Sequence, residues 1–189
     1  MELKVENLTK RYGGKTVLDG VSFALRQGVT CLMAPSGAGK TTLLRLLLGL
    51  ERPDGGQITG LAGRRISAVF QEDRLLPGLD AAGNLRFVLG ADCDEGRAAE
   101  LLGELGLSDV GDKAVRDYSG GMRRRLALAR ALLFPCDILL LDEPFTGLDP
   151  ENRRRAAACV RRHGAGKIVF VVTHEASDAE ALEAEILRI

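Results

Sequence analysis

Residues 29–42 read VTCLMAPSGAGKTT, an apolar run that leads into small residues, a lysine and two threonines. The run VTCLM (29–33) favours a buried strand, and TTLLRLLLGL (41–50) predicts a helix that is apolar nearly all round. In the loop between them, glycines let backbone N–H groups turn inward, and the helix start adds the positive end of its dipole. A strand, a glycine-rich loop and a helix in this order predict a site for phosphate groups.

The residues at the end of this loop indicate that the expected ligand is a nucleotide with a divalent cation. Lys40 supplies a positive charge for β- and γ-phosphates, and the hydroxyl of Thr41 suits Mg²⁺. The usual pattern starts with glycine; Ala34 is acceptable there if its φ stays negative. A purely structural glycine turn is the alternative, which the flanking strand and helix patterns disfavour. We expect ATP and Mg²⁺, with ATP contacted by Pro35, Ser36, Gly37, Ala38, Gly39, Lys40, Thr41 and Thr42.

Strand and helix patterns alternate in the second half of the chain. Apolar strands are predicted at 137–141 and 167–172, with helices near 151–162 and 175–183. Such alternation is typical of a mostly parallel sheet with helices on both faces, in which ligands gather at the carboxyl ends of the strands. The polar segments that follow the three apolar strands should therefore converge on one edge; they are Pro35–Thr41, Asp142-Glu143 and Thr173-His174.

A second, smaller sheet is expected near the N-terminus. Residues 2–8 and 16–25 favour strands joined by a turn at Gly13-Gly14. Two further short strands are expected at 57–61 and 66–70.

A helical insertion separates the two halves of the predicted parallel sheet. From Leu79 to Leu107 the apolar residues recur every three or four positions, which predicts helix. Ser119 can then cap the next helix, in which Met122 and Leu126 share one face.

Two carboxylates follow the predicted strand at 137–141. Asp142, at the end of a buried strand beside the phosphate loop, can hold Mg²⁺, and Glu143 can polarise an attacking water. Taken alone, such a pair is more often a solvated turn or a helix cap. Its combination with Lys40 favours a catalytic site.

Composition excludes several classes of protein. The formal net charge is zero, which disfavours a nucleic-acid-binding protein, and we expect no nucleic-acid partner. The four cysteines are scattered without a C-x-x-C pair, which disfavours both a metal cluster and a disulfide framework. The N-terminus has no signal-peptide pattern, and no apolar run is long enough to cross a bilayer. We therefore expect a chain that does not enter a membrane by itself.

Taken together, these motifs and a second glycine-rich stretch resemble the ATP-binding subunits of ABC transporters. The stretch DYSGGMRRRLALARAL (117–132) is similar to the family's signature motif, with Tyr118 and Met122 in place of the usual leucine and glutamine. Gln71 resembles the glutamine of the glutamine loop, and TGLD (146–149) resembles the D-loop. His174 is similar to the switch histidine, and Tyr12 to the aromatic residue that stacks on adenine.

In the signature stretch, Arg123 and Arg125 match basic positions of the family's motif, whereas Arg124 does not.

The resemblance implies a role for each of these residues. Two subunits would pack head to tail, so that Ser119, Gly120 and Gly121 hold the γ-phosphate of the nucleotide bound by the partner. Glu143, His174 and Gln71 would be catalytic; Thr41, Gln71 and Asp142 would hold Mg²⁺; and Tyr12 and Asp149 would join the nucleotide contacts.

The resemblance also implies a fold. It is the P-loop NTPase fold of ABC ATPases: an α/β fold with a mostly parallel core sheet, a small N-terminal antiparallel β subdomain and a helical insertion. A single domain would span residues 1–189, with 1–77 and 119–189 as the nucleotide-binding core and 78–118 as the helical subdomain.

The function implied is an ATPase that drives a separate transmembrane permease from the cytoplasmic side of the cell membrane, as a peripheral protein. QEDRLLP and DEPFTGLD resemble the importers of nitrate, sulfonate and taurine, which implies import of a small anion and an external solute-binding protein. The predicted docking surfaces for the permease are the helical insertion and Leu75-Leu76-Pro77, which we expect at the surface. The alternatives are a non-transport ABC ATPase and a degenerate, regulatory nucleotide-binding subunit.

Overall fold

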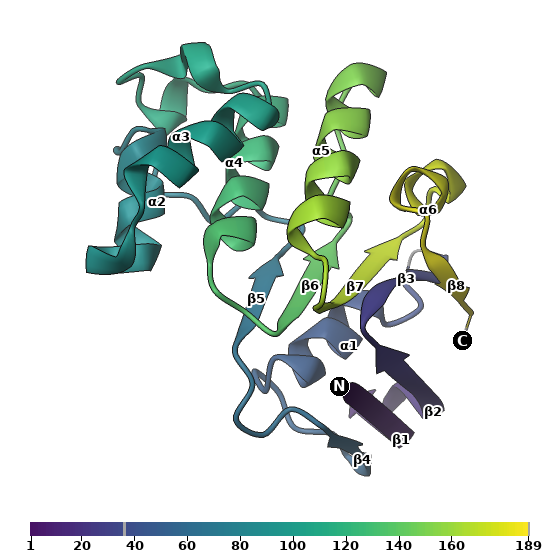
Figure 1. The fold of residues 1–189 in the computed structure, drawn as a ribbon. Coiled ribbons are helices and arrows are strands. Elements are labelled where there is room, and N and C mark those ends of the chain that lie inside the picture. Colours follow the sequence, from purple (N-terminus) through teal and green to yellow (C-terminus); the bar gives the residue numbers. More distant parts are fainter. Residues whose placement is uncertain (36, 189) are drawn as a thin grey trace.

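A parallel sheet forms the centre of the computed structural model, which describes residues 1–35 and 37–188 (Figure 1). Its strand order is β5-β6-β7-β3-β8, and the four strand pairings are all parallel. The alternation predicted from the sequence is therefore confirmed. The strands of this sheet are β3 (Gly28–Met33), β5 (Ile66–Val69), β6 (Ile138–Asp142), β7 (Ile168–Thr173) and β8 (Glu185–Leu187).

A smaller antiparallel sheet is built from the N-terminal strands and has the order β2-β1-β4. The expected strands at 2–8 and 16–25 are longer than predicted, because their pairing continues through register shifts up to the turn at Gly13-Gly14. Such shifts let one strand bend while the ladder carries on. The strands are β1 (Glu2–Tyr12), β2 (Lys15–Arg26) and β4 (Gly55–Thr59).

Helices cover both sides of the parallel sheet, and Figure 1 shows α4 and α5 on one side and α1 on the other. The helices are α1 (Lys40–Leu47), α2 (Ala81–Leu89), α3 (Glu95–Glu104), α4 (Gly120–Leu133), α5 (Pro150–His163) and α6 (Ala176–Leu182). Three short 3₁₀ turns lie in the helical region at Gly90–Asp92, Ser108–Val110 and Val115–Asp117. In the part of the chain that is described, no helix is long and apolar enough to pass through a bilayer.

The two central strands, β6 and β7, are buried along their whole length. Alternate side chains face opposite layers: Leu139 and Leu141 pack with α4 and α5, whereas Leu140 and Phe170 pack with α1 and the antiparallel sheet. Because both faces of the sheet are covered by other elements, these strands are continuous apolar runs and do not alternate between apolar and polar residues. The burial fixes the carboxyl ends of β6 and β7 beside that of β3, where the polar segments follow.

The helical region between β5 and α4 shares its apolar core with the sheet. Leu85 of α2 and Leu101 of α3 belong to the same buried cluster as Leu126 of α4 and Leu139 of β6. The helices predicted over 79–107 are present, and α2 and α3 both pack against α4. A helical subdomain with the boundaries 78–118 stays a prediction.

Candidate nucleotide-binding site

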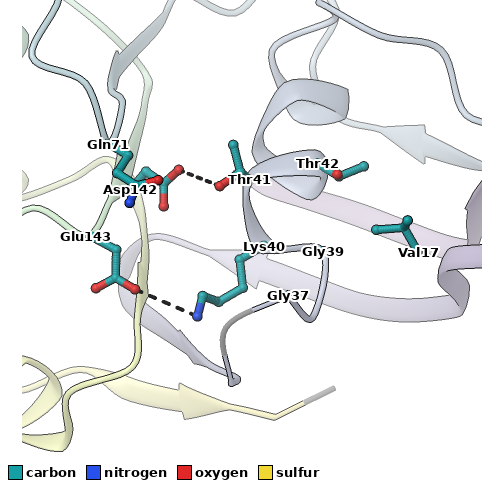
Figure 2. A pocket seen from close by; sticks show the side chains of 9 residues that line it. All are labelled: Val17, Gly37, Gly39, Lys40, Thr41, Thr42, Gln71, Asp142 and Glu143. Carbon is teal, nitrogen blue, oxygen red and sulfur yellow. Dashed lines mark hydrogen bonds and ion pairs between the residues drawn. The ribbon is translucent and has the colours of Figure 1, made fainter. Parts of the chain in front are cut away.

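A pocket of about 340 Å³ lies at the carboxyl edge of the parallel sheet (Figure 2). The loops after β3, β5 and β6 meet there, because neighbouring parallel strands end on the same edge. The sequence predicted this meeting for the segments after β3 and β6; the third predicted segment, after β7, does not line the pocket. The lining residues are Val17, Gly37, Gly39, Lys40, Thr41, Thr42, Gln71, Asp142 and Glu143. Of these, Val17 of β2 was not predicted, since nothing in its local sequence separates it from other strand residues.

The loop before α1 has the backbone that phosphate binding requires. Gly37 and Gly39 both have positive φ, at 83° and 82°. Ala34 is not among the positive-φ residues, which confirms the condition under which alanine is tolerated there. Lys40 donates hydrogen bonds to the carbonyl oxygens of Ala34, at 2.6 Å, and Pro35, at 3.3 Å. The predicted contact Ser36 lies outside the described residues.

Two oxygen-bearing side chains, those of Thr41 and Asp142, are in direct contact on one side of the pocket. The Thr41 hydroxyl donates to Asp142 Oδ2 at 3.0 Å, and the Asp142 side chain is almost fully buried at the end of β6. Burial raises the pKa of the Asp142 carboxyl, although the Thr41 hydrogen bond opposes the shift. A hydroxyl and a carboxylate beside the side chain of Gln71 are hard oxygen ligands, the kind Mg²⁺ prefers. This donor set fits the predicted metal, which would neutralise charge on the nucleotide phosphates.

Glu143 occupies a strained position next to Asp142. Its φ is 48°, in the left-handed region that costs a non-glycine residue on the order of 1–3 kcal/mol. Its N–H donates to Val172 O on the adjacent β7 at 2.8 Å, which holds the backbone in place. Strain of this kind persists where a side chain must be aimed, and here the carboxylate is aimed into the pocket (Figure 2).

His174 lies beside Glu143 at the end of β7. Its Nδ1 is 2.8 Å from Glu143 Oε1, and the same oxygen is 3.7 Å from Lys40 Nζ (Figure 2 shows the lysine contact). The hydrogen bond from Glu143, followed by its charge, raises the pKa of His174. Glu143 therefore contacts both the lysine of the phosphate loop and the histidine that resembles the switch histidine.

Of the predicted nucleotide contacts, Pro35 and Ala38 of the loop do not line this pocket, and neither do Tyr12 and Asp149. The Tyr12 ring is 43% exposed, and its hydroxyl hydrogen-bonds to the Glu51 carboxylate, which raises the pKa of the phenol. Asp149 caps α5 by accepting from the N–H groups of Glu151, at 3.0 Å, and Asn152, at 2.9 Å. Those hydrogen bonds lower the pKa of Asp149.

The signature residues also lie outside it. The Ser119 hydroxyl accepts from Met122 N–H at 3.2 Å, which confirms the predicted cap of α4. Ser119 and Gly120 are exposed and Gly121 is half-buried, and none of the three lines the pocket that holds Lys40. The N-terminus of α4 thus offers free backbone N–H groups on a second surface.

Two arginines of α4, Arg124 and Arg125, are buried, which the sequence did not indicate. Arg124 is the one that departs from the family's motif. In the structure it is 4% exposed and contacts the loops after both β5 and β6. Nothing in the local sequence of the run at 123–125 marks its middle arginine as buried.

A family model described as ABC transporter matches residues 18–146, which include the phosphate loop, Gln71, the signature and the Asp142-Glu143 pair. This match covers more than half of the chain. The chain belongs to the ABC transporter family. It is an ATP-binding subunit of that family.

Curated ABC proteins from several organisms are similar along nearly the whole chain. The "Nod factor export ATP-binding protein I" of Ralstonia nicotianae is 43% identical over 95% of this chain and 61% of its own length. The "Aliphatic sulfonates import ATP-binding protein SsuB 2" of Paraburkholderia xenovorans is 43% identical over 99% of this chain and 76% of its own length. The "Probable sulfate/thiosulfate import ATP-binding protein CysA" of Chlorella vulgaris is 38% identical, with 99% and 86% covered.

Proposed function

We propose that this chain is the ATPase of an importer for a small anionic solute of the sulfonate or nitrate kind. The observation that carries the proposal is one pocket lined by Lys40, Thr41, Gln71, Asp142 and Glu143, with His174 bonded to Glu143. The chain that holds it is similar to relatives named for sulfonate and sulfate import. Relatives named for import of sulfonates or sulfate are 37–43% identical to this chain. The segments QEDRLLP and DEPFTGLD also resemble the importer branch, which favours import.

Each side chain around the pocket has a separate role in ATP hydrolysis. Lys40 leaves the carbonyls of Ala34 and Pro35 to bind the β- and γ-phosphates when ATP enters. Glu143 accepts the proton of the attacking water, a contribution of about 10²- to 10⁴-fold for a general base. His174, already bonded to Glu143, orients that carboxylate and contacts the γ-phosphate.

Thr41, Asp142 and Gln71 are the residues that would hold Mg²⁺. The Thr41–Asp142 hydrogen bond keeps both oxygens on the same side of the pocket before the metal arrives. A metal ion held by these residues would neutralise charge on the nucleotide phosphates. The same set of residues disfavours the degenerate regulatory subunit.

The working unit is a head-to-tail homodimer in this proposal. A nucleotide bound at Lys40 meets only one of the two phosphate-binding surfaces of its own chain, because Ser119, Gly120 and Gly121 lie away from that pocket. A second copy would supply its α4 N-terminus, so ATP would contact both chains and join them. Hydrolysis removes the shared phosphate and releases the dimer.

A separate transmembrane permease, with an external solute-binding protein, is the proposed partner. The predicted docking segment is less accessible than expected, because Leu75 and Leu76 are half-buried and Leu75 packs on the core. The large exposed apolar side chains of this region are Leu79, at 40%, and Phe87, at 69%, with Val88 beside it at 39%. An exposed apolar cluster suits a protein partner, and we place the permease there, with the chain on the cytoplasmic face of the membrane.

The dimer and the chemistry are tested together by light scattering. Glu143→Gln should be monomeric with MgADP and dimeric with MgATP, because binding remains while hydrolysis stops. Adding Ser119→Arg should abolish the dimer and leave ATP binding to the monomer intact. A monomer in MgATP, with ATP demonstrably bound, would refute the homodimer.

The permease surface is tested separately. In a membrane preparation with the permease, Phe87→Glu should abolish co-purification and leave the ATPase rate of the free chain unchanged. Full co-purification of Phe87→Glu would refute this docking surface.

A further inference from the structure

Arg124 is a charged side chain inside the protein, on the face of α4 that points toward the sheet edge. Its side chain is 5% exposed. A guanidinium in that position must have its donors satisfied, since an unpaired buried charge costs several kcal/mol. The hydrogen-bond partners of Arg124 therefore show which parts of the chain it connects.

Those contacts reach two loops that are separate in the sequence. On the loop after β5, Nη1 donates to Phe70 O at 2.5 Å and lies 3.5 Å from Gln71 O. On the loop after β6, Nη2 donates to Glu143 O at 2.6 Å, and Nε donates to Pro144 O at 3.1 Å. The carbonyl of Asp142 accepts from Nη2 as well.

The charge of Arg124 is balanced from the first loop. Asp73 Oδ1 lies 3.2 Å from Nη1, and this carboxylate is the acidic partner of the guanidinium. The remaining partners are neutral carbonyl oxygens, which need donors at fixed angles. Arginine presents five N–H groups in a rigid planar fork, whereas a lysine ammonium is a single point charge on a flexible stem.

A second arginine of α4 allows the two loops to be separated. Arg130 donates to Arg74 O at 2.8 Å and to Asp73 O at 3.0 Å. It has no hydrogen bond to the loop after β6 among the described residues. Arg130 therefore anchors the Gln71 loop to α4, and Arg124 connects that loop to the segment that carries Asp142 and Glu143.

We propose that Arg124 is a positioning residue for ATP hydrolysis: its guanidinium joins the backbone of the Gln71 loop to that of Glu143, so that both side chains face the same pocket. Arg124 does not line the pocket, so it acts through the residues it holds. It holds Glu143 by the carbonyl, next to the strained φ of 48°. The inference rests on the ATPase activity, and it adds a residue that the family's motif does not assign.

The test compares four variants of the full chain. Arg124→Gln removes the fork, and Arg124→Lys keeps the charge opposite Asp73 but cannot span both loops. Arg130→Gln loosens the Gln71 loop alone. Arg161→Gln is the matched structural control, because it removes an arginine that joins α5 to Ala181 O, at 2.9 Å, and to Glu183.

We expect kcat to fall by about 10- to 100-fold in Arg124→Gln and Arg124→Lys, as for a misplacement of about 1 Å, with ATP affinity within about threefold. Arg161→Gln should lower the melting temperature and leave kcat unchanged. Amide hydrogen exchange should quicken over both 70–74 and 142–146 in Arg124→Gln, but only over 70–74 in Arg130→Gln.

Three outcomes would overturn the proposal. In the first, wild-type kcat persists in the folded fraction of Arg124→Gln. In the second, Arg124→Lys restores full kcat, which would assign the effect to charge alone. In the third, exchange over 142–146 is unchanged. A wild-type chain that binds ATP without hydrolysing it would instead contradict the ATPase function, and the exchange measurement would still decide the role of Arg124.

Discussion

Comparing Gly37→Ala with Gly39→Ala separates the cost of backbone strain from the cost of a steric clash. The φ angles of Gly37 and Gly39 are nearly equal, at 83° and 82°. A Cβ at Gly37 would meet no atom within 4 Å among the described residues beyond its chain neighbours. A Cβ at Gly39 would lie 2.8 Å from Leu18 Cδ2 and 2.9 Å from Val17 O, distances that require β2 to move. Gly37→Ala therefore introduces strain alone, and Gly39→Ala introduces strain with a clash.

The magnitudes follow from these two terms. A left-handed alanine costs about 1–2 kcal/mol, and forcing atoms into a packed site adds about 1–3 kcal/mol. The loss of unfolded-state entropy on replacing glycine is common to both variants and cancels. For a chain of this length, about 1 kcal/mol lowers the melting temperature by roughly 2–4 °C. We expect decreases of roughly 2–8 °C for Gly37→Ala and roughly 4–20 °C for Gly39→Ala.

The assay is scanning calorimetry in the absence of nucleotide, because Gly37 also lines the pocket and a bound ligand would add its own clash. Refolding after the scan should be checked, since the comparison assumes two-state unfolding. Equal decreases for the two variants would refute the reasoning, because they would show that the contact with Val17 and Leu18 carries no cost.

Three further predictions concern side chains around the site and α4. The pKa of His174, measured by NMR, should lie above 6.5 in the wild-type chain and should fall toward 6.5 in Glu143→Gln. The His174–Glu143 pair should contribute its whole stabilisation below pH 6.5, and that stabilisation should be lost as the pH rises through the raised pKa of His174. Asp142→Asn should raise the melting temperature measured without nucleotide at neutral pH, because burial raises the pKa of Asp142 and its ionised form destabilises the folded chain. MgATP should no longer stabilise this variant. A lower melting temperature without nucleotide would contradict the prediction. Tyr118→Phe should leave the free energy of unfolding, measured with urea, unchanged or raise it by up to about 1 kcal/mol. The reason is that the buried Tyr118 hydroxyl has no hydrogen-bond partner among the described residues. A clear decrease in the free energy of unfolding would show that the hydroxyl has a partner.

The local features of the site could be predicted because they depend on neighbours in the chain. The strand, loop and helix over 29–42 follow from composition and spacing, and so does the cap at Ser119. The meeting of Asp142 and Thr41 followed from one general rule, that parallel strands end on the same edge.

Arg124 shows what the sequence could not decide. Within the run of three arginines its burial depends on how α4 faces the ends of β5 and β6, and that orientation is set by packing between residues far apart in the chain. The same holds for Leu75, which was expected at the surface but packs on the core, and for Phe87, which lies at the surface. The sequence by itself determined which residues carry the chemistry, because those patterns are local. Only the tertiary structure decided which side chains support them, because burial is a property of the whole packed chain.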